Sequence, residues 1–317
     1  MSNGYGHFIK GEAIEGKSGR HQDVFNPSTG EISGRVALAN ASELDQAVAS
    51  ARAALPAWAS MNPQRRARVL FKFKQLVESR ADDLAQLLSA EHGKVLADAH
   101  GDIQRGLDVI EFACGIPHLL KGEYTQGAGP GIDVYSMRQP VGVVAGITPF
   151  NFPAMIPMWM FGVAIATGCT FILKPSEKDP GVPLLLAELM TQAGAPAGVL
   201  NVINGDKQVV DAIMSHPLIR AVSFVGSSDI AHYVYRGCAE SGKRVQAMGG
   251  AKNHGIILPD ADLDQTVKDI AGAAYGSAGE RCMALSAVVA VGDQTANRFI
   301  EAMREELSNL RVGISTD

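Results

Sequence analysis

From residue 141 to residue 247 the sequence alternates regularly between short apolar runs and amphipathic stretches. Short runs rich in Val, Ile and Phe predict strands, and the stretches between them show the apolar spacing of helices. Parallel strands joined by right-handed helical crossovers form a doubly wound α/β sheet that binds ligands at the carboxyl ends of its strands. The predicted strands are 141–147, 170–173, 199–203, 221–225 and 243–247, and the predicted helices are 154–167, 182–193, 206–214 and 229–240.

Residues 139 to 173 contain no charged side chain, which raises the question of a membrane span. Prolines at 140, 149, 153 and 157 interrupt the segment, and the proline-free part from Met158 to Leu173 is shorter than the ~20 residues of a spanning helix. Parallel strands buried on both faces give the same near-continuous apolar runs. We therefore expect a buried strand, loop, helix and strand here, and no membrane association.

Charge and cysteine content narrow the class of partner. The net charge is −5 and the basic residues are scattered, so nothing resembles a nucleic-acid footprint and we expect a small-molecule substrate. The four cysteines lie far apart without any CxxC spacing, which argues against a metal site and a disulfide framework. No basic and apolar leader is visible at the start, so we expect a reducing, cytoplasmic location.

Three strand ends of the predicted sheet carry groups suited to a dinucleotide. Lys174 and Glu177 follow one strand. A carboxylate there can accept hydrogen bonds from ribose hydroxyls and would repel a 2′-phosphate, which favours NAD over NADP. The alternative for these two residues is a solvated loop without a ligand. Gly226 and Ser227 open a helix whose free N–H groups can bind pyrophosphate, although the full GxGxxG pattern is missing. Gly205 follows the strand between them in the chain.

Cys282 lies beside Arg281 between runs of small residues that let a substrate approach the backbone. Only a thiolate attacks, and a neighbouring cation helps a thiol with a pKa near ~8.5 to ionise. The alternative is a buried structural cysteine. Asn151, in the apolar loop from Thr148 to Pro153, could donate its amide to a reacting carbonyl together with the Cys282 backbone N–H.

The motifs PFNFP, KPSE, FVGSS and the glycine-flanked cysteine, in this order, resemble the aldehyde dehydrogenase superfamily. The resemblance runs from about Asn26 to the end of the chain. It implies that Cys282 is the nucleophile and Asn151 the oxyanion donor. The residues that it implies as NAD contacts are Thr148, Pro149, Phe150, Lys174, Glu177, Gly205, Gly226 and Ser227.

Met248 occupies the position at which hydrolytic members of that superfamily carry a water-activating glutamate. The runs AKNHG and GERCMALS are similar instead to the CoA-acylating methylmalonate-semialdehyde dehydrogenases, where that glutamate is also absent. The resemblance implies oxidation of methylmalonate or malonate semialdehyde to propionyl-CoA or acetyl-CoA with loss of the carboxylate, as in valine catabolism. Arg281 and Arg105 would then bind the substrate carboxylate; for Arg105, a solvated helix charge is the alternative.

We expect the chain to comprise an NAD-binding domain, 1–247, and the first part of a catalytic domain, 248–317. Gly127 to Gly131 precede a strand instead of a helix, so we expect a hairpin, about 123–140, that serves oligomerisation, with a homotetramer for the full-length form. Members of the superfamily are longer, so we expect a truncated chain. The alternatives are a hydrolytic dehydrogenase of a small carboxylated aldehyde and an inactive NAD-binding remnant; a serine hydrolase is excluded because no GxSxG occurs.

Overall fold

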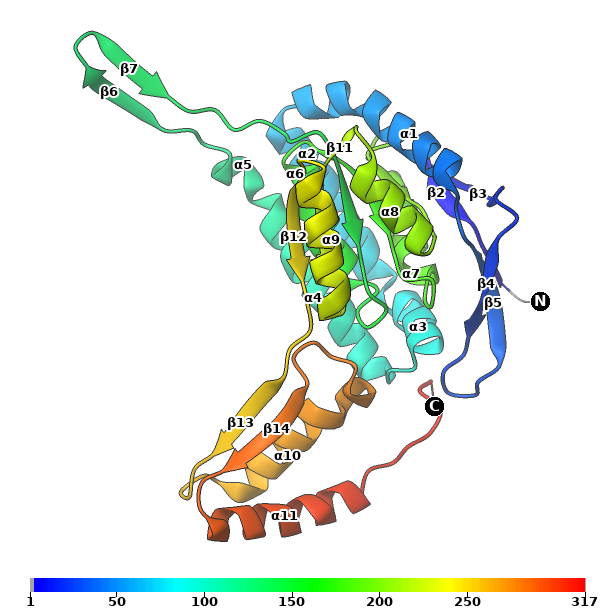
Figure 1. Cartoon of the computed structure of the whole chain (residues 1–317), viewed down its shortest axis with the longest axis vertical. Coiled ribbons are helices and arrows are strands. Elements are labelled where there is room, and N and C mark those ends of the chain that lie inside the picture. The colour runs from blue at the N-terminus through cyan, green and yellow to red at the C-terminus, as the bar shows by residue number, and fades with distance from the viewer. Residues whose placement is uncertain (1–2, 317) are drawn as a thin grey trace.

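A twisted seven-stranded sheet forms the centre of the protein in the computed structural model, which describes residues 3–316 (Figure 1). Its order is β12-β11-β8-β9-β10-β2-β3, and the first five of these strands run parallel. These five are β8 (Val143–Ile147), β9 (Thr170–Lys174), β10 (Leu200–Val202), β11 (Ile219–Val225) and β12 (Arg244–Met248). Their carboxyl ends therefore meet along one edge of the sheet.

Helices cover both faces of this sheet, and the apolar side chains of each face form a separate core. On one face lie α2 (Pro63–Ser79), α3 (Ala81–His92), α4 (Leu96–Cys114), α6 (Met155–Ala166) and α7 (Gly181–Gln192). On the other lie α1 (Ala41–Ser60), α8 (Lys207–Ser215) and α9 (Ser228–Glu240). Successive residues of β9 point to opposite faces, because Phe171 belongs to the first core and Ile172 to the second. The predicted doubly wound α/β sheet is confirmed.

The uncharged segment at 139–173 is buried at the middle of the sheet. It folds into β8, α6 and β9, and all residues of both strands are buried. In the described part of the chain, none of the helices combines the length and the apolar character needed to cross a membrane. The strands and helices expected from residue 141 onward all form, with boundaries shifted by at most about two residues.

Two of the five amino-terminal strands extend the large sheet, and the other three form a small sheet of their own. β2 (His7–Ile9) and β3 (Glu12–Ile14) extend that sheet antiparallel to β10. A second sheet has the order β1-β5-β4, from β1 (Asn3–Tyr5), β5 (Ile32–Ala37) and β4 (His21–Phe25). The segment between β3 and β4 passes near the carboxyl edge of the large sheet, where it contributes Arg20 to a polar network.

A β-hairpin projects away from the body of the protein after the short helix α5 (Ile116–Leu119) (Figure 1). It consists of β6 (Tyr124–Gly129) and β7 (Ile132–Tyr135), paired antiparallel and almost wholly exposed. Gly127 and Gly131 have φ of +65° and +72°, so these glycines turn the chain, as the sequence predicts. The role of the hairpin in oligomerisation stays a prediction.

The segment after β12 forms a smaller α/β unit that lies to one side of the sheet (Figure 1). Its two strands, β13 (Asn253–Ile257) and β14 (Leu285–Ala290), pair in parallel and are joined by α10 (Leu263–Tyr275) and a 3-10 turn, Gly276–Gly279. Helix α11 (Asp293–Ser308) follows. The chain then returns to the end of α3, where the Ser315 hydroxyl donates to the Ser89 carbonyl at 3.1 Å. The predicted combination of a Rossmann-like sheet with the first part of a second α/β unit is confirmed.

Candidate active site

Cys282 lies in a loop between α10 and β14 and is the exposed member of the four cysteines, since the other three are buried. The loop begins with an unusual backbone: Ser277 and Ala278 have φ of +54°, and Gly279 has φ of +74°. Non-glycine residues rarely adopt positive φ, so contacts elsewhere must hold this conformation. On the other side of Cys282, the Asn253 amide donates to the Cys282 and Ala284 carbonyls at 3.0 and 3.1 Å.

Arg281 folds back over Gly276 and pairs with Asp98 of α4. Its Nη2 lies 2.7 Å from Asp98 Oδ1, and its Nη1 donates to the Gly272 carbonyl at 3.3 Å. The absent side chain of Gly276 makes room for the guanidinium, because a Cβ there would lie 2.6 Å from Nη2. The second Asp98 oxygen accepts the Ser277 N–H at 3.1 Å. The guanidinium that the sequence suggests for substrate is thus also a structural tie of the cysteine loop.

The loop that carries Asn151 joins β8 to α6 and is held by a buried ion pair. Lys94 Nζ donates to the Asn151 carbonyl at 2.7 Å and lies 3.1 Å from Asp102 Oδ2, and the side chains of Lys94 and Asp102 are both fully buried. The other Asp102 oxygen accepts the Met155 N–H at 2.7 Å, at the start of α6. Lys94 also lies 4.3 Å from the centre of the Phe152 ring. Burial lowers the pKa of Lys94 and raises that of Asp102, while each partner opposes the shift of the other.

The side-chain amide of Asn151 makes no hydrogen bond to the described residues. Its Oδ1 is buried without a hydrogen-bond partner, and within residues 3–316 its Nδ2 donates to no protein acceptor. The Thr148 hydroxyl, three residues earlier in the same loop, is likewise buried and unpaired in the described structure. Buried polar groups are normally satisfied, so unpaired ones at a strand end mark a place where a ligand can bind.

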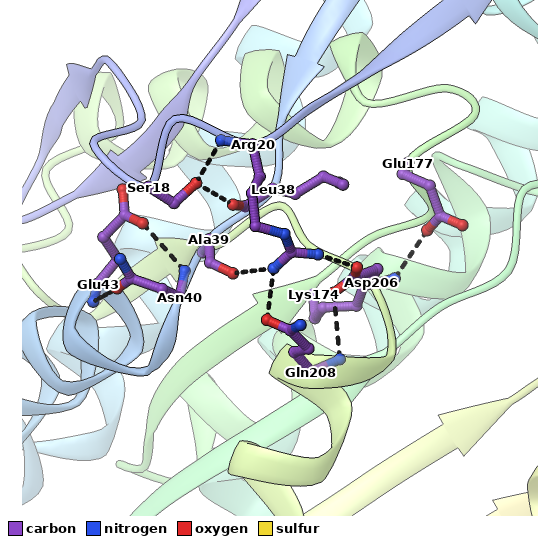
Figure 2. A network of polar contacts seen from close by, with 10 residues as sticks. All are labelled: Ser18, Arg20, Leu38, Ala39, Asn40, Glu43, Lys174, Glu177, Asp206 and Gln208. Carbon is purple, nitrogen blue, oxygen red and sulfur yellow. Dashed lines mark hydrogen bonds and ion pairs between the residues drawn. The ribbon is translucent and has the colours of Figure 1, made fainter.

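Polar groups gather at the carboxyl ends of β9 and β10 (Figure 2). Lys174 Nζ lies 3.0 Å from Glu177 Oε2, and the Glu177 side chain remains partly exposed. Figure 2 shows Arg20 reaching into this region, where its guanidinium pairs with Asp206 and donates to Gln208 Oε1 at 2.6 Å. Arg20 ties the amino-terminal segment to the start of α8, a contact that the sequence patterns do not predict.

The glycines expected at the cofactor site, Gly205 and Gly226, follow their strands at positions too crowded for a side chain. A Cβ at Gly205 would lie 2.3 Å from Val209, and one at Gly226 would lie 2.5 Å from the Phe224 ring. Ser227 is the exposed N-cap of α9, without a side-chain cap, so the free N–H groups of that helix face solvent. Met248 ends β12, and its carbonyl accepts the Gly226 N–H at 3.1 Å.

Phe150, directly before Asn151, lines a cavity of about 730 Å³. The centre of the Phe150 ring lies 6.1 Å from the centre of the His92 ring and 4.3 Å from Lys178 Nζ. Burial raises the pKa of Glu91 to about 7 and lowers the pKa of His92 to about 3.

Arg105 is exposed on α4 and has no ion-pair or hydrogen-bond partner for its guanidinium among the residues described. It follows Asp98 by seven residues and Asp102 by three, so the three side chains share one face of the helix. On this face, Asp98 contacts the cysteine loop and Asp102 contacts the end of the Asn151 loop.

Similarity to known proteins identifies the family of the chain. The model of the aldehyde dehydrogenase family matches residues 14–317. The chain belongs to the aldehyde dehydrogenase family. A malonate-semialdehyde dehydrogenase of Pseudomonas aeruginosa is 54% identical over 98% of this chain and 62% of its own length. The human mitochondrial acylating methylmalonate-semialdehyde/malonate-semialdehyde dehydrogenase is 47% identical over 96% of this chain and 57% of its own length.

Solved aldehyde dehydrogenase structures superpose closely on the chain. A methylmalonate-semialdehyde dehydrogenase of Oceanimonas doudoroffii has a TM-score of 0.98 at 52% identity, over 100% of this chain and 64% of that one. A Sinorhizobium meliloti protein, provisionally assigned as methylmalonate-semialdehyde dehydrogenase and complexed with NAD, has a TM-score of 0.99 at 62% identity, over 100% of this chain and 65% of that one. The chain thus spans less than two thirds of the length of these relatives.

The sequence motifs do not reveal the residues that hold the two loops, namely Lys94, Asp98 and Asp102. A signal is present for Asp102, because it lies among apolar positions on the buried face of its helix. A carboxylate at such a position must have a partner. The sequence does not reveal, however, which distant loop supplies it.

Proposed function

We propose that the full-length form of this aldehyde dehydrogenase oxidises malonate or methylmalonate semialdehyde with NAD and transfers the acyl group to coenzyme A. The observation that carries the proposal is the combination of an exposed Cys282, an unpaired Asn151 amide on a fixed loop, and methionine at position 248. The names of the similar enzymes support the substrate class.

The donor set at the sheet edge fits NAD. Glu177 would accept hydrogen bonds from the hydroxyls of the adenosine ribose, with Lys174 holding the Glu177 carboxylate. The start of α9, at Gly226 and Ser227, would bind the pyrophosphate. Thr148, Pro149, Phe150 and Gly205 would line the same edge. A Sinorhizobium meliloti neighbour was solved with NAD, which supports the assignment. When bound, NAD supplies the acceptor for the hydride that leaves the substrate carbon.

The first step is the addition of the Cys282 thiolate to the aldehyde carbon. The C=O π pair moves to oxygen, and the resulting oxyanion accepts hydrogen bonds from Asn151 Nδ2 and the Cys282 backbone N–H. Loss of hydride from this carbon leaves a thioester on Cys282. We propose that Arg105, whose guanidinium is unpaired in the described structure, binds the substrate carboxylate, with the remaining N–H groups of Arg281 as a second contact.

Release of the acyl group depends on the nucleophile. In the thioester formed from malonate semialdehyde, the carbonyl lies β to a carboxylate. Loss of carbon dioxide therefore leaves its bonding electron pair on the thioester as an enolate. Asn151 Nδ2 and the Cys282 backbone N–H stabilise the enolate oxygen before the enolate carbon is protonated. Met248 cannot accept a proton, so water is not activated there. Coenzyme A carries a thiol that ionises on its own and is the better acyl acceptor.

The assembly and location of the full-length protein are part of the same proposal. We propose a homo-oligomer, a tetramer, in which the exposed β6–β7 hairpin contributes to the interface. We propose a reducing cytoplasmic location, because the four cysteines are free and unpaired.

The test of the nucleophile and its oxyanion donor uses two variants of the full-length form. Cys282→Ala should abolish NADH formation from malonate semialdehyde, since no covalent adduct can form. Asn151→Ala should slow it by about 10² to 10³, the usual effect of removing one oxyanion donor. A Cys282→Ala protein that still produced NADH at the normal rate would refute the proposal.

A further inference from the structure

Helix α4 presents two aspartates, one helical turn apart, to the two loops of the candidate site. Asp98 accepts the Ser277 N–H at 3.1 Å and pairs with Arg281 at 2.7 Å, so both of its oxygens bind the cysteine loop. Asp102 accepts the Met155 N–H at 2.7 Å and pairs with Lys94 at 3.1 Å. Lys94 in turn donates to the Asn151 carbonyl. The two loops are far apart in the sequence but are held by neighbouring turns of one helix.

We propose that Asp98 and Asp102 are positioning residues that fix Cys282 and Asn151 relative to each other. The inference rests on the proposed roles of Cys282 as nucleophile and Asn151 as oxyanion donor. Thiolate addition needs both groups at one carbonyl, the sulfur at its carbon and the amide at its oxygen, so small displacements of either loop lower the rate steeply. A common support for the two loops supplies this alignment before substrate binds.

The first turn of the cysteine loop is held by Asp98 and by one backbone bond within the turn, from the Glu280 N–H to the Ser277 carbonyl at 2.9 Å. Ala278, Gly279 and Glu280 are exposed, and the positive φ values of Ser277 and Ala278 are unfavourable without compensating contacts. Asp98 supplies such contacts at both ends of this turn, to the backbone of Ser277 and to the side chain of Arg281. Asparagine at position 98 keeps the shape but removes the charge and one acceptor.

The Asn151 loop depends on Lys94 and Asp102 in a different way. A buried ion pair is poor evidence for a gain in stability, because desolvation offsets the attraction between the charges. This pair holds backbone at both ends of the loop, through the Asn151 carbonyl and the Met155 N–H. Helix α4 also lies against α6 at Gly106, where a Cβ would lie 3.2 Å from the Met155 Cα. The pair therefore fixes the loop against α4 and does not merely fill space.

Two reactions of Cys282 separate alignment from simple reactivity, and both can be measured on this chain without NAD. With iodoacetamide the thiolate displaces iodide, forms no oxyanion and does not need Asn151. With p-nitrophenyl acetate the thiolate adds to the ester carbonyl, an oxyanion forms, and p-nitrophenolate leaves as the acetyl group remains on sulfur. The ratio of the acetylation rate to the alkylation rate thus reports the alignment of the two loops. A Cys282→Ala chain supplies the blank for both reactions.

We expect Asp98→Asn and Asp102→Asn each to lower this ratio by tenfold or more. Asp108→Asn is the matched control, since Asp108 is exposed on the same helix and, among residues 3–316, its side chain bonds only to Gln104. Its ratio should equal that of the unchanged chain. The double variant Asp98→Asn/Asp102→Asn should lose little more than the worse single variant, because one displaced loop already removes the alignment.

If Asp102→Asn fails to fold because it leaves Lys94 buried and unpaired, Lys94→Met/Asp102→Asn removes the charge as well as the contact and should lower the ratio equally. Unchanged ratios in folded variants, or equal losses in both reactions, would overturn the inference. NADH formation from malonate semialdehyde is measured separately on the full-length form. Its absence beside a normal ratio would refute the proposed function and leave the positioning of the two loops standing.

Discussion

The space over Gly276 gives a sharp test of how the cysteine loop is held. An alanine Cβ at this position would lie 2.6 Å from Arg281 Nη2 and 2.8 Å from both Cζ and Nη1. The Gly276 backbone has φ −56° and ψ 140°, which alanine adopts without strain. The perturbation therefore acts on the guanidinium, which must move away from Asp98.

The size of the effect follows from the contact that is lost. A charge-assisted hydrogen bond contributes about 1.5 to 3 kcal/mol. The Arg281 and Asp98 side chains are 23% and 27% exposed, so solvent screening reduces this value to about 1 kcal/mol. Loss of the contact to the Gly272 carbonyl adds up to about 1 kcal/mol. Gly276→Ala should thus lower the free energy of unfolding by about 1 to 2 kcal/mol in this account.

Gly272→Ala is the matched control, because Gly272 is exposed inside α10. Apart from the neighbouring backbone of the same helix, no described heavy atom lies within 4 Å of the position that an alanine Cβ would take. Alanine favours the helix by about 0.5 to 1 kcal/mol, so this variant should be as stable as the unchanged protein or more stable. Urea unfolding followed by circular dichroism measures both variants. A Gly276→Ala protein as stable as the Gly272→Ala protein would refute the account of the loop.

Three further predictions concern two buried titratable groups and the substrate carboxylate. Burial raises the pKa of Glu91 from 4.5 to about 7. The contribution of Glu91 to the free energy of unfolding is therefore complete below pH 4.5 and is lost as the pH rises through 7. Glu91→Gln should remove this decline in stability, measured by urea unfolding across that pH range. Burial lowers the pKa of His92 from 6.5 to about 3, so its contribution to the free energy of unfolding is lost as the pH falls below 6.5. His92→Asn should lessen this loss of stability between pH 6.5 and 3. An unchanged pH dependence of stability in the Glu91 or the His92 variant would contradict the pKa shift given for that residue. Arg105→Leu should lower kcat/KM of the full-length form for malonate semialdehyde about ten- to a hundredfold and much less for propanal, and equal losses would exclude a carboxylate contact.

The regular part of the fold was predictable because local pattern decides it. The strands and helices after residue 141 have the expected periods, and strand alternation places Phe171 and Ile172 on opposite faces. The motif order also indicated Cys282 and Asn151 as the central candidates. The supports of these residues were not predictable, because Asp98 and Lys94 contact segments far away in the sequence. Only the folded packing of α4 brings these groups together.

Arg281 illustrates the same limit in a single side chain. A guanidinium next to a cysteine indicates a role in binding substrate or activating the thiol, and both roles stay predictions. The structure adds a third role, because the side chain turns away to Asp98 over the small surface of Gly276. The sequence shows small residues around Cys282 but not why position 276 is glycine. The reason is the close approach of the Arg281 guanidinium to Gly276.

The central claim, that a Cys282 thioester waits for coenzyme A, is tested most directly by NADH formation in the absence of coenzyme A. With the full-length form, NAD and malonate semialdehyde, the account predicts a burst of about one NADH per active site followed by near arrest, because Met248 offers water no base. The mass of the Cys282 peptide should then show an acyl group, and coenzyme A should restart turnover and release acetyl-CoA. Steady NADH production that yields free acid without coenzyme A would contradict the claim.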